Sequence, residues 1–447
     1  MSNLETVTDA LLAAATKAGA DAADAMSIRG QSVSIDVRGG ALEHSERSEG
    51  TDIGLRVLVS GRQACVSASD TSLQTITALA ERAVAMAREA PEDPYAGLAG
   101  AHQLVTDWDI AALELADPSA EPSPDELKAD AIAAEAAALA VKGVSQVQSA
   151  TAGYGQTDVH LAATNGFSGG YTRTSRGLNC VAIAGSGAGM ERDYDGDSRV
   201  FQSDLRSAED IGTRAGTQAV ERLDATKPPT GAYPVLFDER ISSSLIGHIL
   251  AAANGAAVAR GVSWLRGSLG EQILPAGLSI IEDPSRPRVG ASRPFDAEGL
   301  PVQKRSIVDQ GVLTGWTLDL ASARQLNMQS TGNAARGTSA PPNPSNWNIS
   351  LTQGDKGRDE LLADMGTGLL VTSMIGSTIN PNTGDYSRGA SGFWVEGGEI
   401  RYPVNECTVA GNLHEMLKTM IPANDARSYL SRVVPSLLIE GMTLAGA

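Results

Sequence analysis

The stretch His160-Leu161-Ala162-Ala163-Thr164-Asn165-Gly166-Phe167-Ser168-Gly169-Gly170-Tyr171-Thr172 carries the clearest local structural signal in the chain. Asn165-Gly166 separates two short runs, and Asn-Gly is the dipeptide preferred by two-residue hairpin turns, whose central residues need positive φ. We therefore expect an antiparallel hairpin here, followed by a further strand at Leu178–Ala184. An antiparallel sheet at the centre of the chain is the starting point for the rest of the fold.

Two helices are expected on either side of this sheet. Ser123-Pro124-Asp125-Glu126 combines a capping serine, a proline at the first helical position and a glutamate at the third, which predicts a helix ending near Lys142. Ser207-Ala208-Glu209-Asp210 opens a second capped helix that ends near Leu223. Residues 101–226 therefore form a middle unit of helices and antiparallel strands, with a proline-rich connector up to about residue 123.

Residues 1–100 are predicted to form an N-terminal α+β unit. A helix over Leu4–Lys17 precedes the strands, and a second helix, capped by Asp70 or Thr71, closes the unit. The expected strands are Ser32–Val37, Ile53–Val59 and Gln63–Ala68.

A larger, β-rich C-terminal domain is predicted for residues 227–447, beginning after Lys227-Pro228-Pro229. We expect one helix over Ile241–Ala259 and a hairpin around Gly397-Gly398. The other expected strands are Val235–Phe237, Leu278–Glu282, Gly311–Leu318, Asn348–Leu351, Leu369–Met374 and Pro435–Leu444. The fold class predicted for the whole chain is α+β.

Charge and composition exclude several classes of function. Among 447 residues, 35 Lys and Arg face 53 Asp and Glu, and the net charge of −18 argues against a nucleic-acid binder. No apolar stretch is long enough to span a membrane, and the first residues do not form a secretory signal. The three cysteines lie far apart, so we expect free thiols and a cytoplasmic protein.

An acidic segment, Arg192–Asp197, offers one possible ligand site. Asp193, Asp195 and Asp197 have the 1-3-5 spacing of a calcium loop, but Gly196 stands at position 4 where the loop needs glycine at position 6. A solvated acidic loop is the favoured interpretation.

The histidines and serines give no catalytic site by themselves. None of the five histidines has a second His or Cys at metal-ligand spacing, and His248 on the predicted helix is interpreted as a satisfied core residue. Ser243 and Ser244 lie on the same helix, without a nucleophile-elbow motif or a visible acid–His relay.

Several blocks in one order do point to a family. They are Gly50-Thr51-Asp52-Ile53-Gly54-Leu55-Arg56-Val57, Arg192-Asp193-Tyr194, Ser268-Leu269-Gly270, Gly311-Val312-Leu313, Ser322-Ala323-Arg324, Thr331-Gly332-Asn333, Gly384-Asp385-Tyr386-Ser387-Arg388-Gly389-Ala390-Ser391-Gly392, Ala410-Gly411-Asn412-Leu413 and Pro435-Ser436-Leu437-Leu438-Ile439-Glu440-Gly441-Met442. Over nearly its full length the chain resembles the TldD/PmbA family, also called the modulator of DNA gyrase or U62 peptidase family, and within it the PmbA or TldE branch.

This resemblance implies a heterodimeric zinc peptidase. Its TldD-type subunit carries a His-Glu-x-x-x-His helix and a C-terminal cysteine, which hold zinc and activate a water molecule. Matched to this chain, the first histidine becomes Ser243, the glutamate becomes Ser244 and only His248 remains, while Arg427–Pro435 holds no cysteine. The resemblance thus implies a non-catalytic subunit that binds no cofactor, with zinc in a TldD-type partner.

By the same analogy, the pair encloses a chamber that admits small or unfolded peptides, and Arg192, Asp193 and Tyr194 are candidate substrate-binding or chamber-lining residues. Two alternatives stay open. One is a peptide-binding or gyrase-associated regulatory homodimer without catalysis, and the other is an autonomous hydrolase that uses Ser243 or Ser244.

Overall fold

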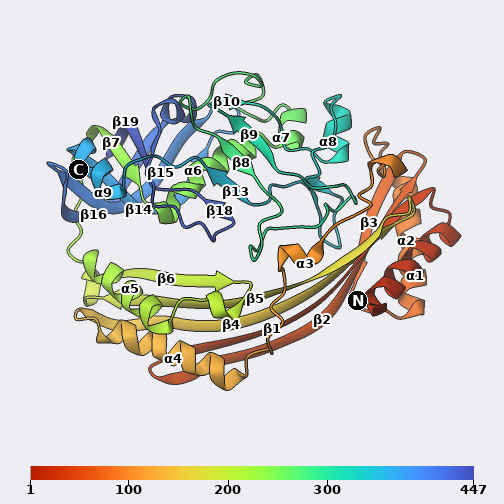
Figure 1. The fold of residues 1–447 in the computed structure, drawn as a ribbon, viewed down its shortest axis with the longest axis horizontal. Helices are drawn as coiled ribbons and strands as arrows, with labels where there is room; N and C mark the ends of the chain where they lie inside the picture. The colour runs from red at the N-terminus through yellow and green to blue at the C-terminus, as the bar shows by residue number, and fades with distance from the viewer. Residues whose placement is uncertain (1, 447) are drawn as a thin grey trace.

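The computed structural model describes residues 2–446, and its largest element is a long, curved, six-stranded antiparallel sheet with the order β3-β2-β1-β4-β5-β6. The strands are β1 (Ala22–Arg38), β2 (Ala41–Val59), β3 (Arg62–Ala68), β4 (Val144–Ala163), β5 (Ser168–Ala184) and β6 (Glu191–Arg199). Figure 1 shows this sheet arching beneath the C-terminal unit, with helices on its outer, convex side. The sheet combines strands of the predicted N-terminal unit, residues 1–100, with strands of the predicted middle unit, residues 101–226. The boundary between the two units at residue 100 stays a prediction.

The central hairpin is confirmed, although its turn and its second strand differ from expectation. Gly166 has φ +98°, whereas Asn165 is not among the residues with positive φ, and the Asn165 side chain instead accepts a hydrogen bond from the Phe167 N–H. The strand after the turn runs without interruption through the polar residues between the two predicted pieces. Thr174 and Arg176 in that stretch are buried. Because both are polar, the sequence pattern did not predict that β5 is one continuous strand.

The acidic segment is a strand, so the prediction of a solvated loop was wrong. In β6 every second side chain faces the same side, and Asp193, Asp195 and Asp197 are all buried there. Arginine side chains neutralise these three carboxylates: Arg240 contacts Asp193 at 3.1 Å, Arg206 contacts Asp195 at 2.8 Å and Arg199 contacts Asp197 at 2.9 Å. The three aspartates stand two residues apart because alternate residues of a β-strand face the same side, and not because they form a calcium loop.

Four helices cover the convex face of the sheet in two pairs. The first pair, at one end, is α1 (Ser2–Ala18) and α2 (Leu73–Glu89); the second is α4 (Pro124–Ala140) and α5 (Ala208–Glu221). The capping box of α4 forms as expected: Ser123 Oγ accepts from the Glu126 N–H, and the Glu126 carboxylate accepts from the Ser123 N–H. The cap of α2 is Ser72, and not Asp70 or Thr71 as predicted. A short helix, α3 (Ile110–Leu113), interrupts the connector.

The C-terminal unit contains two further sheets, which confirms an α+β protein with a strand-rich C-terminal part. The first has the order β16-β15-β14-β7-β19-β17 and consists of β7 (Gly231–Phe237), β14 (Gly368–Ile379), β15 (Asp385–Glu396), β16 (Glu399–Asn412), β17 (Ile421–Pro422) and β19 (Leu437–Ala445). The second has the order β10-β9-β8-β13-β18 and consists of β8 (Ile280–Glu282), β9 (Arg305–Asp309), β10 (Val312–Leu313), β13 (Ile349–Leu351) and β18 (Arg432–Val433). A separate short pair is β11 (Ala334–Ala335) and β12 (Asn343–Pro344).

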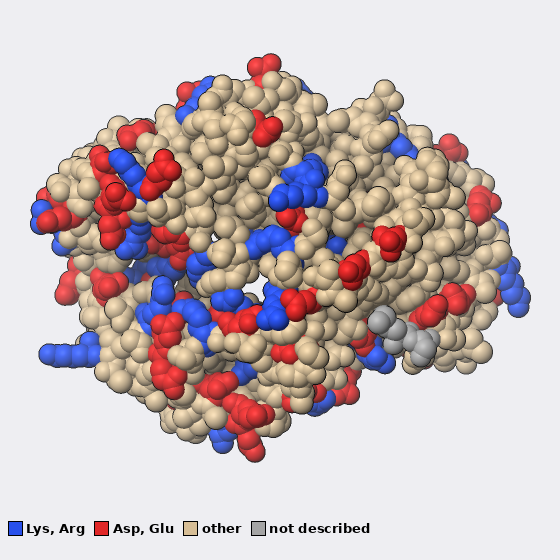
Figure 2. All heavy atoms as spheres, in the orientation of Figure 1, with Lys and Arg blue, Asp and Glu red and all other residues tan. Residues whose placement is uncertain are grey.

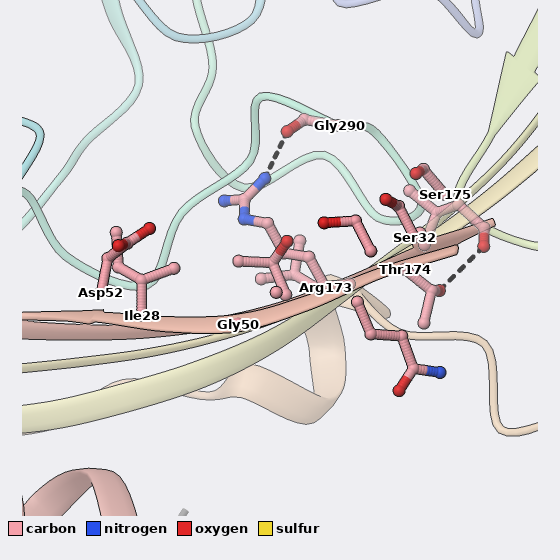
Figure 3. A pocket seen from close by; sticks show the side chains of 15 residues that line it. Ile28, Ser32, Gly50, Asp52, Arg173, Thr174, Ser175 and Gly290 are labelled. Atoms are coloured by element: carbon pink, nitrogen blue, oxygen red, sulfur yellow. Dashed lines mark hydrogen bonds between the residues drawn. The ribbon is translucent and has the colours of Figure 1, made fainter. Parts of the chain in front are cut away.

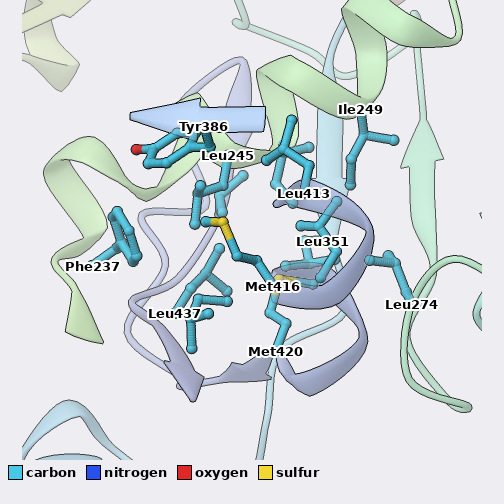
Figure 4. Close-up of a cluster of buried hydrophobic side chains, with 14 of the residues drawn as sticks. Phe237, Leu245, Ile249, Leu274, Leu351, Tyr386, Leu413, Met416, Met420 and Leu437 are labelled. Carbon is cyan, nitrogen blue, oxygen red and sulfur yellow. The ribbon is translucent and has the colours of Figure 1, made fainter. Parts of the chain in front are cut away.

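The helices of this unit pack among the sheets. They are α6 (Glu239–Ala252), α7 (Gly255–Ala259), α8 (Leu320–Gln325), α9 (Arg358–Met365) and α10 (Leu413–Met416). The single helix predicted for Ile241–Ala259 is two helices, because α6 ends at Ala252 and the side chain of Asn254 caps α7. The strand predicted for Gly311–Leu318 extends only over Val312–Leu313. Figure 4 shows the core, where Leu245 and Ile249 of α6 lie beside Tyr386, Leu413 and Leu437.

The C-terminal unit contacts the large sheet at several places, among them an aromatic cluster and an ion pair. In the aromatic cluster, Phe295 packs edge-on against Trp108, Phe167 and Tyr171, with ring centroids 5.0–5.7 Å apart. The ion pair of Asp193 and Arg240 joins the sheet to α6. Figure 2 shows the molecule hollowed between its upper and lower halves, with charged side chains around the opening. Among the described residues, no helix is long and apolar enough to cross a membrane.

Candidate functional site

Helix α6 carries the positions that the family resemblance singled out. Asp238 caps it by accepting from the Arg240 N–H at 3.1 Å, and Leu245, Ile246 and Ile249 anchor one face in the core. Ser244 and His248 lie one turn apart on the helix, so the two side chains lie on the same face.

Ser244 and His248 each have one side-chain polar atom that is buried without a hydrogen-bond partner. These atoms are Ser244 Oγ and His248 Nε2, so the interpretation of His248 as a satisfied core residue was wrong. Burial lowers the pKa of His248 to about 4, with a further contribution from the Arg388 charge, and the imidazole is therefore neutral near pH 7. Its ring meets Tyr386 edge-on at 5.8 Å. The two side chains make no hydrogen bond to each other, and a serine nucleophile activated by His248 has no geometric support.

The same residues do not fit a catalytic zinc ion. Zinc in peptidases needs three protein ligands, and hydroxyl groups at positions 243 and 244 are poor substitutes for imidazole and carboxylate. Cys407 is occupied elsewhere, because its thiol donates to the Ala390 carbonyl at 3.1 Å and burial raises its pKa to about 11. No group of three His, Cys, Asp or Glu side chains suited to a metal ion occurs in the part of the chain that the structure describes.

The three residues predicted to line a chamber lie in different environments. Arg192 is exposed and donates to Gln148 at 3.3 Å, while Asp193 is buried between Arg222 and Arg240. Tyr194 is 53% exposed and lies at the wall of a cavity. The three do not converge on one point, because neighbouring residues of a strand alternate between its faces.

That cavity, of about 660 Å³, lies between the sheet and the C-terminal unit. Tyr194 and small residues of the sheet line one side, and Arg240, Arg427 and Leu430 of the C-terminal unit line the other. Both arginines are already paired, Arg240 with Asp193 and Arg427 with Glu239 at 2.8 Å. The cavity therefore offers balanced charge and no free cationic group.

A second cavity of about 520 Å³ continues along the same face of the sheet. The two share Ser32, Gly155 and Ser175 as lining residues, and Gly30 and Gly50 also contribute to the floor of the second. Figure 3 shows Arg173 rising from this floor to donate to the carbonyl of Gly290, in the C-terminal unit. Ser243, Ser244 and His248 are not among the residues that line these two cavities.

Sequence reasoning did not identify Arg173, Arg240 or Arg427 as cavity residues. Arg240 and Asp193 are 47 positions apart, and Arg427 and Glu239 are 188 apart. Nothing in local spacing signals such pairs, and only the folded arrangement brings them together.

Comparisons with known proteins fit this geometry along the whole chain. Residues 23–87, 117–223 and 230–446 match the models for domain 1, the central domain and the C-terminal domain of the PmbA/TldA metallopeptidases. The chain is 36% identical to Metalloprotease PmbA of Escherichia coli O157:H7 over 444 residues, which is 99% of this chain and 96% of the relative. It belongs to the PmbA/TldD family.

Other members of the PmbA/TldD family extend this agreement. A Metalloprotease PmbA homolog of Haemophilus influenzae is 36% identical over 97% of this chain and 94% of its own length. A crystal structure from Bacteroides thetaiotaomicron, named as a modulator of DNA gyrase, superposes with a TM-score of 0.92 at 26% identity and covers all of both chains. TldE from Thermococcus kodakarensis has the same fold, with a TM-score of 0.85 at 20% identity over 98% of this chain and 100% of its own.

Proposed function

We propose that this chain is the non-catalytic, TldE-type subunit of a heterodimeric zinc peptidase whose TldD-type partner carries the metal. The observation that carries the proposal is the replacement of the family's His-Glu pair by Ser243 and Ser244 on α6, beside the neutral, unpartnered His248. With one of three ligands and no base, this chain has no means of activating a water molecule for attack on a peptide bond.

The role of such a subunit is to shape access to the partner's metal. The cavities of 520 and 660 Å³ lie between two units that are fixed to each other on both sides, by Phe295 at one end and Asp193 at the other. Space of this size admits small or unfolded peptides and excludes folded domains. The three thiols, none in a disulfide, fit a cytoplasmic location.

Co-expression with a TldD-type chain tests the proposal. We expect the purified pair to contain zinc and cleave an unstructured peptide, and this chain alone to do neither. Matched variants then assign the activity: alanine at the zinc-binding histidines of the partner abolishes cleavage, whereas Ser243→Ala with Ser244→Ala in this chain preserves it. Stoichiometric zinc and peptide cleavage by this chain alone would overturn the proposal.

The same variants decide between the proposal and an autonomous serine hydrolase, since that hydrolase would lose activity in the double alanine variant. The alternative of a regulatory homodimer is considered because two structural neighbours are named as modulators of DNA gyrase. Light scattering tests it by measuring the mass of the particle in solution. A mass equal to two copies of this chain, unchanged when the partner is added, would favour that alternative.

A further inference from the structure

One half of strand β2 forms a long free edge of the large sheet. Strand β3 pairs with β2 only over residues 53–59, while β1 pairs with β2 over residues 41–58, with a bulge at Glu43. Residues 41–52 therefore have a neighbour on one side only within the described chain. Every residue from Ala41 to Gly50 is exposed.

Such an edge presents backbone N–H and C=O groups that another strand can bind. In an antiparallel ladder, alternate residues direct these groups outward, so a segment of this length offers a row of donors and acceptors. Proteins usually blunt such edges by shortening or covering them, or with proline, a bulge or charged side chains. Residues 41–52 contain no proline, and they carry a bulge at Glu43 and several charged side chains.

The side chains of this edge are strongly acidic. Glu43, Glu46, Glu49 and Asp52 stand against a single basic residue that is always charged, Arg47. Arg47 is already bound, because its guanidinium contacts both Glu49 and Glu121 at 2.6 Å. Arg38 of the neighbouring strand β1 lies 3.4 Å from Glu43, and the four carboxylates still exceed these two arginines. The segment that we call the β2 edge, residues 41–52, therefore keeps a surplus of negative charge.

From this surplus we infer that the β2 edge is the docking surface for an extended, lysine- or arginine-bearing segment of the TldD-type partner, which adds a strand to the sheet. Main-chain hydrogen bonds supply the binding and the acidic side chains select the basic strand. A second copy of this chain would bring the same negative segment to the edge, and like charges between opposed strands are destabilising. The inference rests on the proposed heterodimer and names the surface that forms it.

The experiment measures the affinity between this chain and the TldD-type partner by titration calorimetry. The test variant is Glu43→Lys/Glu46→Lys/Glu49→Lys. The control variant, Glu81→Lys/Glu89→Lys/Glu271→Lys, makes the same change in net charge at exposed positions away from the edge. We expect the test variant to bind about tenfold more weakly or worse, the control to bind like the wild type, and the wild-type affinity to fall with added salt.

Thermal unfolding of the variants, together with the single change Glu46→Lys, separates weakened docking from a loss of folding. Unchanged affinity in a folded test variant would overturn the inference and leave the proposed heterodimer standing. Absence of any complex with wild-type protein would overturn both. A third outcome is that the wild-type protein forms homodimers and the test variant does not. The β2 edge would then pair with a second copy of this chain, which would equally contradict the inference.

Discussion

At the scale of single residues, Asp193 has a role in joining two parts of the molecule that its sequence context does not indicate. Its carboxylate lies 3.1 Å from Arg240 and 3.4 Å from Arg222, and joins the sheet to α6 and to the end of α5. The buried side of β6 could have been anticipated from the two-residue spacing of its aspartates. The arginines that make this burial possible are separated from Asp193 by 29 and 47 positions, so no local pattern reveals them.

Replacing Asp193 with asparagine should destabilise the protein. The change keeps the shape of the side chain but removes the carboxylate that two largely buried arginines share, leaving Arg240 with Asp238 at 3.4 Å and Arg222 with Glu191 at 3.8 Å. Because breaking a buried ion pair costs about 3–5 kcal/mol and these second partners remain, we expect a loss at or below the lower end of that range. Chemical denaturation measures the effect, with exposed Glu81→Gln as the control. An Asp193→Asn variant as stable as that control would show that the ion pairs do not hold the two units together.

A second residue-scale prediction concerns Glu298, which is buried beside Asp296, Asp319 and Arg56. Burial, reinforced by the two neighbouring carboxylates, raises the pKa of Glu298 well above its usual value, while burial raises the pKa of Asp296 to about 6. Because the folded protein holds these protons more tightly than the unfolded chain, their contribution to stability is present at low pH. It is lost as the pH rises from the unfolded pKa toward the folded one.

Glu298→Gln removes one of these titrations and retains an acceptor for the Leu320 N–H. We therefore expect the melting temperature of the wild type to fall more steeply than that of the variant as the pH rises above the ordinary glutamate pKa of 4.5. Parallel pH profiles would contradict the raised pKa. Asp296 remains in both proteins, and because the two carboxylates interact, the difference between the profiles reports the titration of this pair with and without Glu298.

At the scale of elements, predictability follows from how local the determining interactions are. The helix α4 could be predicted from Ser123 and Glu126 because its capping box involves residues three positions apart. The break between α6 and α7 could not, because the cap at Asn254 is supported by Pro344, whose carbonyl accepts from the Asn254 side chain. The unbroken course of β5 depends likewise on Asp130, in α4, which pairs with the buried Arg176.

The pair α4 and α5 offers a test of element packing. A Cβ added at Gly212 would lie 2.0 Å from the Ala134 carbonyl oxygen, so this glycine allows the two helices to approach closely. Gly212→Ala should destabilise the protein by about 1–3 kcal/mol through overpacking, even though alanine favours helix by up to about 1 kcal/mol. Exposed Thr213→Ala, on the same helix, is the control and should be close to neutral. Stabilisation by Gly212→Ala would mean that the helices are not in close contact.

At the scale of the whole molecule, the cavities depend on the arrangement of the two layers. Aromatic packing around Phe295 and the ion pairs of Asp193 hold the C-terminal unit over the sheet, and the space between them remains open. The α+β class and the strand-rich C-terminal part could be predicted from element patterns. The sharing of one sheet by strands from residues 22–68 and 144–199 could not, since the pairing of β1 with β4 joins segments more than a hundred residues apart.

The zinc content and peptidase activity of the separated and combined subunits test the central proposal most directly. We predict about one zinc ion per heterodimer, supplied by the partner's ligands, no stoichiometric zinc in this chain alone, and full cleavage by a pair carrying Ser243→Ala and Ser244→Ala. One zinc ion bound by this chain alone, together with cleavage of an unstructured peptide, would contradict the account.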